Sequence, residues 1–243
     1  AHAATWVERR LLALGEAVST ISPQMCCRLI DKGIAPDRVL EMRNWLDDRF
    51  VPDPDGASTI RTAWNLQGKT VALYSGNIAR KQGIEIVIAA ARLLEKRHDI
   101  VFVICGEGPN RGELEQNCAG LSNVLLRDLQ PAGRMGAMMA MADLHLLPQL
   151  AEAADLVLPS KLINMLASGR PVIATCAPGT GLFAEVEGCG MNTPPGDAAA
   201  LARAIAELAD DPLRRHQLGA AAVRRAEERW HKDTIIDRAL AFV

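Results

Sequence analysis

From Thr70 onward, short apolar runs alternate with segments that are apolar on one face only. The runs Val71–Ser75, Ile100–Cys105 and Leu144–Leu147 are almost continuously apolar, as expected of strands buried on both faces of a sheet. Between the first two, residues 84–94 carry apolar side chains at helical spacing. Strands that alternate with helices predict an α/β fold with a doubly wound parallel sheet, whose ligands bind beyond the carboxyl ends of the strands.

The pattern continues to the end of the chain. Further strands are expected at Val124–Leu126, at Val172–Ala174 and at residues 190–193. Further helices are expected at residues 113–118, 135–141 and 161–168, around Phe183, and in two long segments that begin at Asp197 and Pro212.

The first 46 residues predict a smaller unit. An amphipathic helix at residues 4–16 precedes a single strand, helix, strand unit that is too small to fold by itself. The acidic, proline-rich run 47–56 is typical of a linker, which we extend to residue 66. We therefore expect a βαβ remnant at 1–46, a linker at 47–66, a ligand-binding domain at 67–230 and a C-terminal helix at 231–243. Asp53-Pro54-Asp55 imitates the Asp-x-Asp metal motif of some sugar transferases, but two prolines favour a solvated turn.

Composition excludes several classes of function. The formal charge is 27 minus 29, or -2, so no global charge recruits nucleic acid. Aromatic residues make up only 4% of the chain, too few for base-stacking platforms. The six cysteines form no CxxC pair, which favours reduced thiols in a cytoplasmic protein over a zinc site or disulfides. The chain starts without Met inside an expected helix, so we expect a piece of a longer protein.

The stretch LVLPSKLINMLASGRPVIAT, residues 156–175, predicts a loop, a helix and a buried strand. Ser160 is a good N-cap residue, and Gly169 suits the left-handed position that ends a helix. With Lys161 beside the free N–H groups of the first turn, this helix start is suited to an anion. An ordinary α/β repeat in which the serine merely caps the helix explains the pattern equally well.

Two more loops contain residues that could contact an anionic ligand. Gly76, after the first strand of the domain, lets backbone approach a ligand, and Arg80 and Lys81 precede the next helix. Cations at a helix start oppose the helix dipole, which favours phosphate binding over a merely solvated turn. The third loop, 106–109, has the sequence GEGP, which breaks the dinucleotide-binding pattern GxGxxG.

These motifs together resemble a known family. YSGN and KQG at 74–83, CGEGP at 105–109, LPSKLINMLASGRPVIAT at 158–175 and PPGD at 194–197 are similar to the donor half of family 4 glycosyltransferases of the GT-B fold. The STIS and NW pieces at 19–22 and 44–45 also fit, so the resemblance covers nearly the whole chain. It is closest to the branch that makes bacterial exopolysaccharide and O-antigen, such as colanic-acid and L-fucosamine transferases. The implied domain is Rossmann-like and forms the C-terminal half of such an enzyme.

The resemblance implies roles by position. Gly76 would lie against the donor diphosphate, with Lys81 neutralising its charge, while Asn77 stands where the family commonly has arginine. Asn164 falls on the glutamate that usually holds the ribose, and Leu156 on its partner glutamate. Gly181 stands where the family often has a glutamate after Gly-Thr. The expected catalytic residues are Arg80, Lys81 and Lys161, and the expected donor-binding residues are Gly76, Asn77, Gly106, Glu107, Gly108, Glu152, Asp155, Ser160 and Asn164.

The implied reaction is transfer of a sugar from a UDP- or GDP-sugar to a glycan or polyprenyl-linked acceptor. The resemblance implies retention at the anomeric carbon, no metal and no other cofactor. Because most of the N-terminal domain is missing, we expect the piece alone to bind donor without transferring sugar. Apolar residues on helix 4–16 and in the tail 231–243 predict that these segments dock together or form a homodimer. Two alternatives remain: a sugar-nucleotide 2-epimerase on the same fold, and a non-catalytic interaction domain.

Overall fold

A computed structural model describes residues 2–151 and 158–242, with the side chains of all of these except residues 2–4, 13 and 81. Within these residues the larger body is a six-stranded sheet in the order β5-β4-β3-β6-β7-β8, parallel throughout. The first strand of this sheet lies inside it, and the chain proceeds to one edge and then to the other, which confirms the predicted doubly wound fold. The strands are β3 Thr70–Ser75, β4 Ile100–Cys105, β5 Val124–Arg127, β6 Leu144–Leu147, β7 Val172–Thr175 and β8 Gly190–Thr193.

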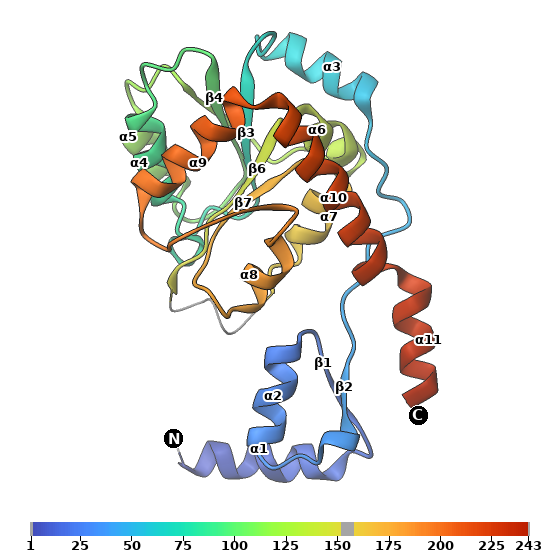
Figure 1. The fold of residues 1–243 in the computed structure, drawn as a ribbon. Helices are drawn as coiled ribbons and strands as arrows, with labels where there is room; N and C mark the ends of the chain where they lie inside the picture. Colours follow the sequence, from blue (N-terminus) through green and yellow to red (C-terminus); the bar gives the residue numbers. More distant parts are fainter. Residues whose placement is uncertain (1, 152–157, 243) are drawn as a thin grey trace.

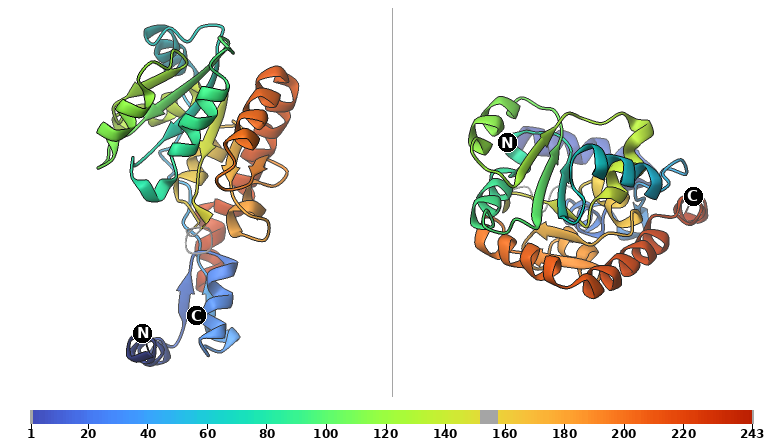
Figure 2. Two further views of the ribbon diagram at one scale, coloured as in Figure 1. Left: turned by 90° about the vertical axis from the view of Figure 1, so that its left-hand side faces the viewer. Right: turned by 90° about the horizontal axis from the view of Figure 1, so that it is seen from above.

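Helices cover both faces of this sheet (Figure 1, Figure 2). One core cluster lies under α4 Glu85–Leu93, α5 Arg111–Cys118 and α9 Ala198–Asp210. The other lies under α3 Pro54–Ala63, α6 Met135–Met141, α7 Lys161–Ala167, α8 Gly181–Val186 and α10 Pro212–Trp230. Short 3-10 helices occur at η2 Arg80–Gln82 and η3 Ala132–Arg134, and α11 Lys232–Phe242 follows α10.

Several helix boundaries follow from local chemistry. The carboxylates of Asp197 and Asp211 accept hydrogen bonds from the backbone N–H groups of Ala200 and Arg214, both at 2.8 Å, so the two long helices begin where the sequence predicts. Gly169 ends α7 with φ +72, the left-handed conformation expected of a glycine after a helix.

The predicted linker proved too long. Asp53 caps α3 by accepting from the N–H of Gly56 at 2.9 Å, and Pro54 occupies the first helical position. Ala57 and Ile60 of this helix are buried in the main core, so residues 54–63 belong to the larger body. Asp53 of the Asp-x-Asp imitation is thus a helix cap, and proline at N1 is the signal that points to it.

Residues 2–41 form a second, smaller segment beside the carboxyl ends of the strands (Figure 1). Helix α1 His2–Leu14 leads to β1 Val18–Thr20, and α2 Pro23–Asp31 and η1 Pro36–Arg38 lead to β2 Val39–Glu41, which pairs with β1 in parallel. Ser22 caps α2 by accepting from Met25 N–H. This is the expected βαβ unit.

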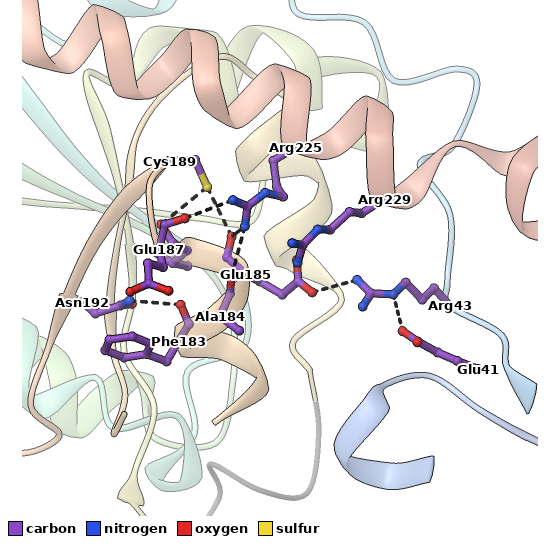
Figure 3. Close-up of polar contacts among 11 residues, drawn as sticks. Glu41, Arg43, Phe183, Ala184, Glu185, Glu187, Cys189, Asn192, Arg225 and Arg229 are labelled. Atoms are coloured by element: carbon purple, nitrogen blue, oxygen red, sulfur yellow. Dashed lines mark hydrogen bonds and ion pairs between the residues drawn. The ribbon is translucent and has the colours of Figure 1, made fainter. Parts of the chain in front are cut away.

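A buried charge cluster joins the two bodies (Figure 3). The carboxylate of Glu185, on α8, is only 5% exposed and pairs with Arg43 at 2.8 Å and with Arg229 at 3.0 Å. Arg43 also pairs with Glu41 and lies over the ring of Trp230, 5.7 Å from its centroid. The segment that leaves β2 is therefore held between α8 and the end of α10.

Candidate functional site

The turn after β3 is a close contact between two distant loops. Gly76 has φ +145, a backbone conformation that residues with a Cβ rarely adopt. A Cβ placed there would lie 3.4 Å from Nζ of Lys161, the first residue of α7. The positive φ is therefore what favours glycine at this position, and the Lys161 ammonium lies close to the turn at the carboxyl end of the central strand β3.

Lys161 is a half-buried cation that has no counter-ion among residues 2–151 and 158–242. Its Nζ lies 4.4 Å from the centroid of the Tyr74 ring, and no carboxylate within the described residues lies within ion-pair distance of it. Burial lowers the pKa of Lys161 to about 8. An ammonium that is partly desolvated and unneutralised is suited to bind an anion such as phosphate.

Tyr74 supports this loop and was not anticipated from the sequence. The side chain is fully buried, and its hydroxyl donates a hydrogen bond to the backbone carbonyl of Asn77 at 2.7 Å. Burial, followed by the charge of Glu85, raises the pKa of Tyr74. The available signal was a tyrosine, the only one in the chain, at the end of an otherwise aliphatic strand.

The glycines of the GEGP loop have a packing role. A Cβ at Gly106 would collide with the carbonyl oxygen of Gly76, and a Cβ at Gly108 with that of Ile78. The Ile78 N–H donates to the carbonyl of Glu107 at 2.8 Å, whereas the Glu107 side chain is exposed. The two loops therefore stack directly, and close packing accounts for both glycines. Donor contacts by Gly106, Glu107 and Gly108 stay predictions.

The two cations predicted in the first loop, Arg80 and Lys81, both belong to η2. Arg80 is exposed and pairs with Glu113 of α5 at 3.4 Å, and its backbone N–H donates to Asn110. An exposed pair of this kind is weak enough to yield to a phosphate. Lys81 lies in η2, and its side chain is outside the described part of the structure.

Ser160 does not cap α7, contrary to the prediction. Its φ and ψ, -58 and -29, are already helical, and its side chain makes no capping hydrogen bond. A cap requires extended backbone at this position, so the hydroxyl cannot close onto the first turn. Instead the carbonyl of Pro159 accepts from Leu162 N–H at 3.0 Å.

Asn164 lies one turn along α7 from Lys161 and lines a hollow of about 410 Å³. Phe50, Val51 and Met135 also line it, so its walls come from the chain before α3 and the start of α6. Residues three apart on a helix are surface neighbours, so Asn164 and Lys161 lie on the same side of α7, although Lys161 itself does not line the hollow. Of the remaining predicted residues, Glu152 and Asp155 lie outside the described residues, as does Leu156.

His145 has no basic role at this site. The ring is completely buried in β6, and its Nε2 lies 2.9 Å from Oγ of Ser168, which donates its own proton to the carbonyl of Met165. Nε2 therefore carries the proton that this contact requires. Burial lowers the pKa of His145 to about 3, so the ring is neutral. His145 is therefore a neutral core residue.

The site and sheet together define a class of protein: a parallel α/β domain with a glycine turn and a lysine ammonium at the carboxyl end of its central strand. The sequence pattern of the family described as "Glycosyl transferases group 1" matches residues 69–211. The chain belongs to this family, as the resemblance predicted.

Individual relatives agree with this assignment. The Escherichia coli (strain K12) protein named for colanic acid biosynthesis as the glycosyl transferase WcaI is 40% identical over 181 residues, covering 72% of this chain and 44% of the relative. Alpha-D-kanosaminyltransferase of Streptomyces kanamyceticus is 28% identical over 222 residues, covering 88% and 56%. The chain thus spans about half the length of these relatives.

Solved structures share the fold. The Anabaena protein HepE in complex with UDP-glucose matches with a TM-score of 0.81 at 20% identity, over 98% of this chain and 67% of that one. Sucrose-phosphate synthase from Thermosynechococcus elongatus matches with a TM-score of 0.78 at 22% identity, over 100% of this chain and 61% of that one.

Across the described residues, no helix is both long and apolar enough to cross a membrane.

Proposed function

We propose that this chain is the donor-binding half of a glycosyltransferase and binds a nucleotide-diphosphate sugar. The observation that carries the proposal is the Lys161 ammonium, held against Gly76 at the carboxyl end of β3 without a carboxylate partner among the described residues. In a parallel sheet of this order, that edge is where ligands bind. Of the parts of a nucleotide-sugar, the diphosphate matches such a cation best.

The donor would lie along α7. Its diphosphate would occupy the turn at Gly76, next to Lys161, with Lys81 and Arg80 as further cations from η2. Its nucleoside would enter the hollow lined by Asn164, whose amide can bond a ribose hydroxyl. The adjacent positions of Lys161 and Asn164 on one helix support this order of contacts, because a nucleoside and its phosphates are also neighbours.

The proposed reaction is transfer of the sugar with retention at the anomeric carbon and without a metal or other cofactor. Positive groups at the diphosphate stabilise the negative charge that develops on the leaving group. Among the described residues, no group of three or more His, Cys, Asp or Glu is placed to hold a metal.

The finer assignments follow from the relatives. HepE is solved with UDP-glucose, and mycobacterial relatives are named as GDP-mannose-dependent, so we propose UDP- or GDP-linked hexosyl or deoxyhexosaminyl donors. WcaI is named for colanic acid biosynthesis. For this chain we propose a glycan or polyprenyl-linked acceptor in exopolysaccharide or O-antigen synthesis. The acceptor site would belong to an N-terminal domain largely outside this chain. The chain alone would bind donor without transfer, and the whole enzyme would be cytoplasmic or peripheral to the inner membrane.

We also propose that the isolated chain self-associates through α1. Trp6 and Leu11 are 60% and 63% exposed, and Leu14 is 82% exposed, so this helix presents uncovered apolar surface. Apolar surface of this kind drives association in soluble proteins. Light scattering of the chain and of a Leu11→Glu variant tests this: a strictly monomeric wild-type chain at high concentration contradicts it.

A thermal-shift screen with UDP, GDP, ADP and NAD tests the proposed function. A ligand that binds the folded state raises the melting temperature in proportion to RT ln(1 + [L]/Kd). We expect stabilisation by UDP or GDP and none by NAD. Stabilisation by NAD alone, or by none of the four, overturns the proposal.

A further inference from the structure

Tyr74 contacts two groups beside the turn at Gly76, where the donor diphosphate is proposed to bind: the Lys161 ammonium and the backbone carbonyl of Asn77. Its ring lies 4.4 Å from Nζ of Lys161, and its hydroxyl donates to the carbonyl of Asn77 at 2.7 Å. The side chain is completely buried at the end of β3, one residue before Ser75 and two before Gly76. A single side chain therefore connects the loop that must receive an anion with the cation that must bind it.

The ring provides attraction without neutralisation. The face of an aromatic ring carries partial negative charge and attracts an ammonium at this distance. A carboxylate in the same place would hold Lys161 more strongly, but its full negative charge would compete with an incoming phosphate for that ammonium. An aromatic face leaves the positive charge available while restricting where it lies.

The hydroxyl fixes the other side of the turn. A buried tyrosine hydroxyl needs a hydrogen-bond partner, and the hydroxyl of Tyr74 donates to the carbonyl of Asn77 directly after the left-handed Gly76. This bond restrains the peptide that follows the turn. The stacked GEGP loop restrains it further, because Ile78 N–H donates to the Glu107 carbonyl.

We propose that Tyr74 is a positioning residue for diphosphate binding, with its ring holding the Lys161 ammonium over Gly76 and its hydroxyl fixing the turn. The inference rests on the proposed donor-binding function. It adds a residue that acts on the anion through Lys161 and the Asn77 peptide, without contacting the donor itself.

Titration calorimetry of two variants tests this role. The ligand is whichever of UDP, GDP and ADP the wild-type chain binds most tightly, alongside the corresponding nucleoside. We expect Tyr74→Leu to weaken nucleoside-diphosphate binding about tenfold, the size of a desolvated cation–π contact, and nucleoside binding less than about twofold. Tyr74→Phe keeps the ring, so we expect a loss of only about threefold. A purely structural role would lower both affinities alike.

A double-mutant cycle separates positioning from general packing. In the Lys161→Ala background, Tyr74→Leu should weaken nucleoside-diphosphate binding by less than about twofold, because the cation it orients is gone. Phe102→Leu is the matched control, because Phe102 is also completely buried, in the neighbouring strand β4. This substitution should leave the ratio of nucleoside-diphosphate affinity to nucleoside affinity unchanged.

The outcomes are distinct. Additive losses in the cycle, or equal losses for nucleoside and nucleoside diphosphate, overturn the role of Tyr74 and leave the proposed function standing. Absence of binding by the wild-type chain overturns the proposed function and this inference with it. If Tyr74→Leu does not fold, Tyr74→Phe in the same cycle decides: an effect on the nucleoside diphosphate equal to that on the nucleoside contradicts the proposal.

Discussion

Two regions of this molecule bury positive charge in opposite ways. In the cluster between the two bodies, Arg43 and Arg229 both pair with the buried carboxylate of Glu185. At the carboxyl end of β3, Lys161 has an aromatic ring beside it and, among the described side chains, no carboxylate. The first arrangement satisfies its charges within the chain, and the second leaves one available to a ligand.

The difference separates structure from function. A buried ion pair whose partners are all present holds the packed segments in one arrangement. Removing one partner leaves an uncompensated buried charge and destabilises the fold. A desolvated, unneutralised cation costs stability in the free protein and recovers it only when an anion binds. We therefore expect changes at Glu185 to affect stability, and changes at Lys161 to affect ligand affinity.

The largest effect is expected from Glu185→Ala. The substitution leaves Arg43 and Arg229 without their shared carboxylate, and we expect a loss of about 3 kcal/mol in the free energy of unfolding. This is the lower end of the usual range, because Arg229 is 39% exposed and water can partly solvate it. Urea denaturation measures the loss. The control is Glu187→Ala, an exposed glutamate one residue beyond α8, with a change below about 0.5 kcal/mol.

One outcome would contradict the distinction between a structural cluster at Glu185 and a ligand-binding cation at Lys161. If Glu185→Ala left stability unchanged and weakened nucleoside-diphosphate binding instead, the cluster would belong to the ligand site.

Lys161→Ala should weaken nucleoside-diphosphate binding by about 1.5 to 3 kcal/mol, the range for hydrogen bonds to charged groups. Stability should not fall, because the removed ammonium has no counter-ion among the described residues. Lys81→Ala is expected to act in the same range. Lys96→Ala, at an exposed lysine in the turn between α4 and β4, is the control for net charge. Unchanged affinity in both test variants would remove these lysines from the site.

The pH dependence of binding should follow Lys161. Its pKa of about 8 lies below the ordinary lysine value, so the ammonium is lost as the pH rises through that range. We expect the affinity advantage of the wild-type chain over Lys161→Ala to fall about tenfold between pH 7 and pH 9.5. Comparing the two proteins cancels titration of the nucleotide itself. A constant advantage across this range would contradict the assignment.

The same shift predicts a change in stability of the free protein. Between pH 8 and the ordinary lysine pKa, the unfolded chain binds the proton that the folded chain has released, so the contribution of Lys161 to the free energy of unfolding rises with pH. The buried cysteines, whose pKa values are raised by burial, contribute in the opposite direction as their thiols ionise in the unfolded chain. Below pH 8 both states bind it, and the contribution of Lys161 is constant and unfavourable. The cysteines are present in both proteins, so we expect the free energy of unfolding of the wild-type chain to rise relative to that of Lys161→Ala between pH 7.5 and 9.5, as denaturation of both proteins at the two pH values would reveal. An unchanged difference between the two proteins would contradict the shift.

The smallest effect is expected at Asn164. Asn164→Ala should cost about 1 kcal/mol with a ribonucleotide and little with its 2′,3′-dideoxy analogue, because only the ribonucleotide has hydroxyls to lose. Calorimetry with both ligands measures the difference. Equal losses would mean that Asn164 only shapes the hollow.

Local patterns determined most of the fold. Strands buried on both faces are continuous apolar runs, and helix starts at Asp197 and Pro212 are fixed by neighbouring residues, so both can be read from the sequence. The helix in the predicted linker was missed because its acidic, proline-rich start was interpreted as a turn. Its buried face, which contains Ala57 and Ile60, can be recognised only in the tertiary structure, where it packs on the main core.

The site depended more on tertiary structure. The sequence identified Gly76 and Lys161 as candidates, because a glycine after a strand and a lysine at a helix start are local signals. That their atoms meet, and that Tyr74 joins them, was decided by the order of β3 and β6 in the sheet, which brings two distant loops to one edge. Likewise, Arg43 and Glu185 are 142 residues apart, and only the packing of α8 against the chain after β2 pairs them. The sequence identifies which charged groups a loop contains. Whether those charges are neutralised depends on distances between residues far apart in the chain, and only the tertiary structure determines these distances.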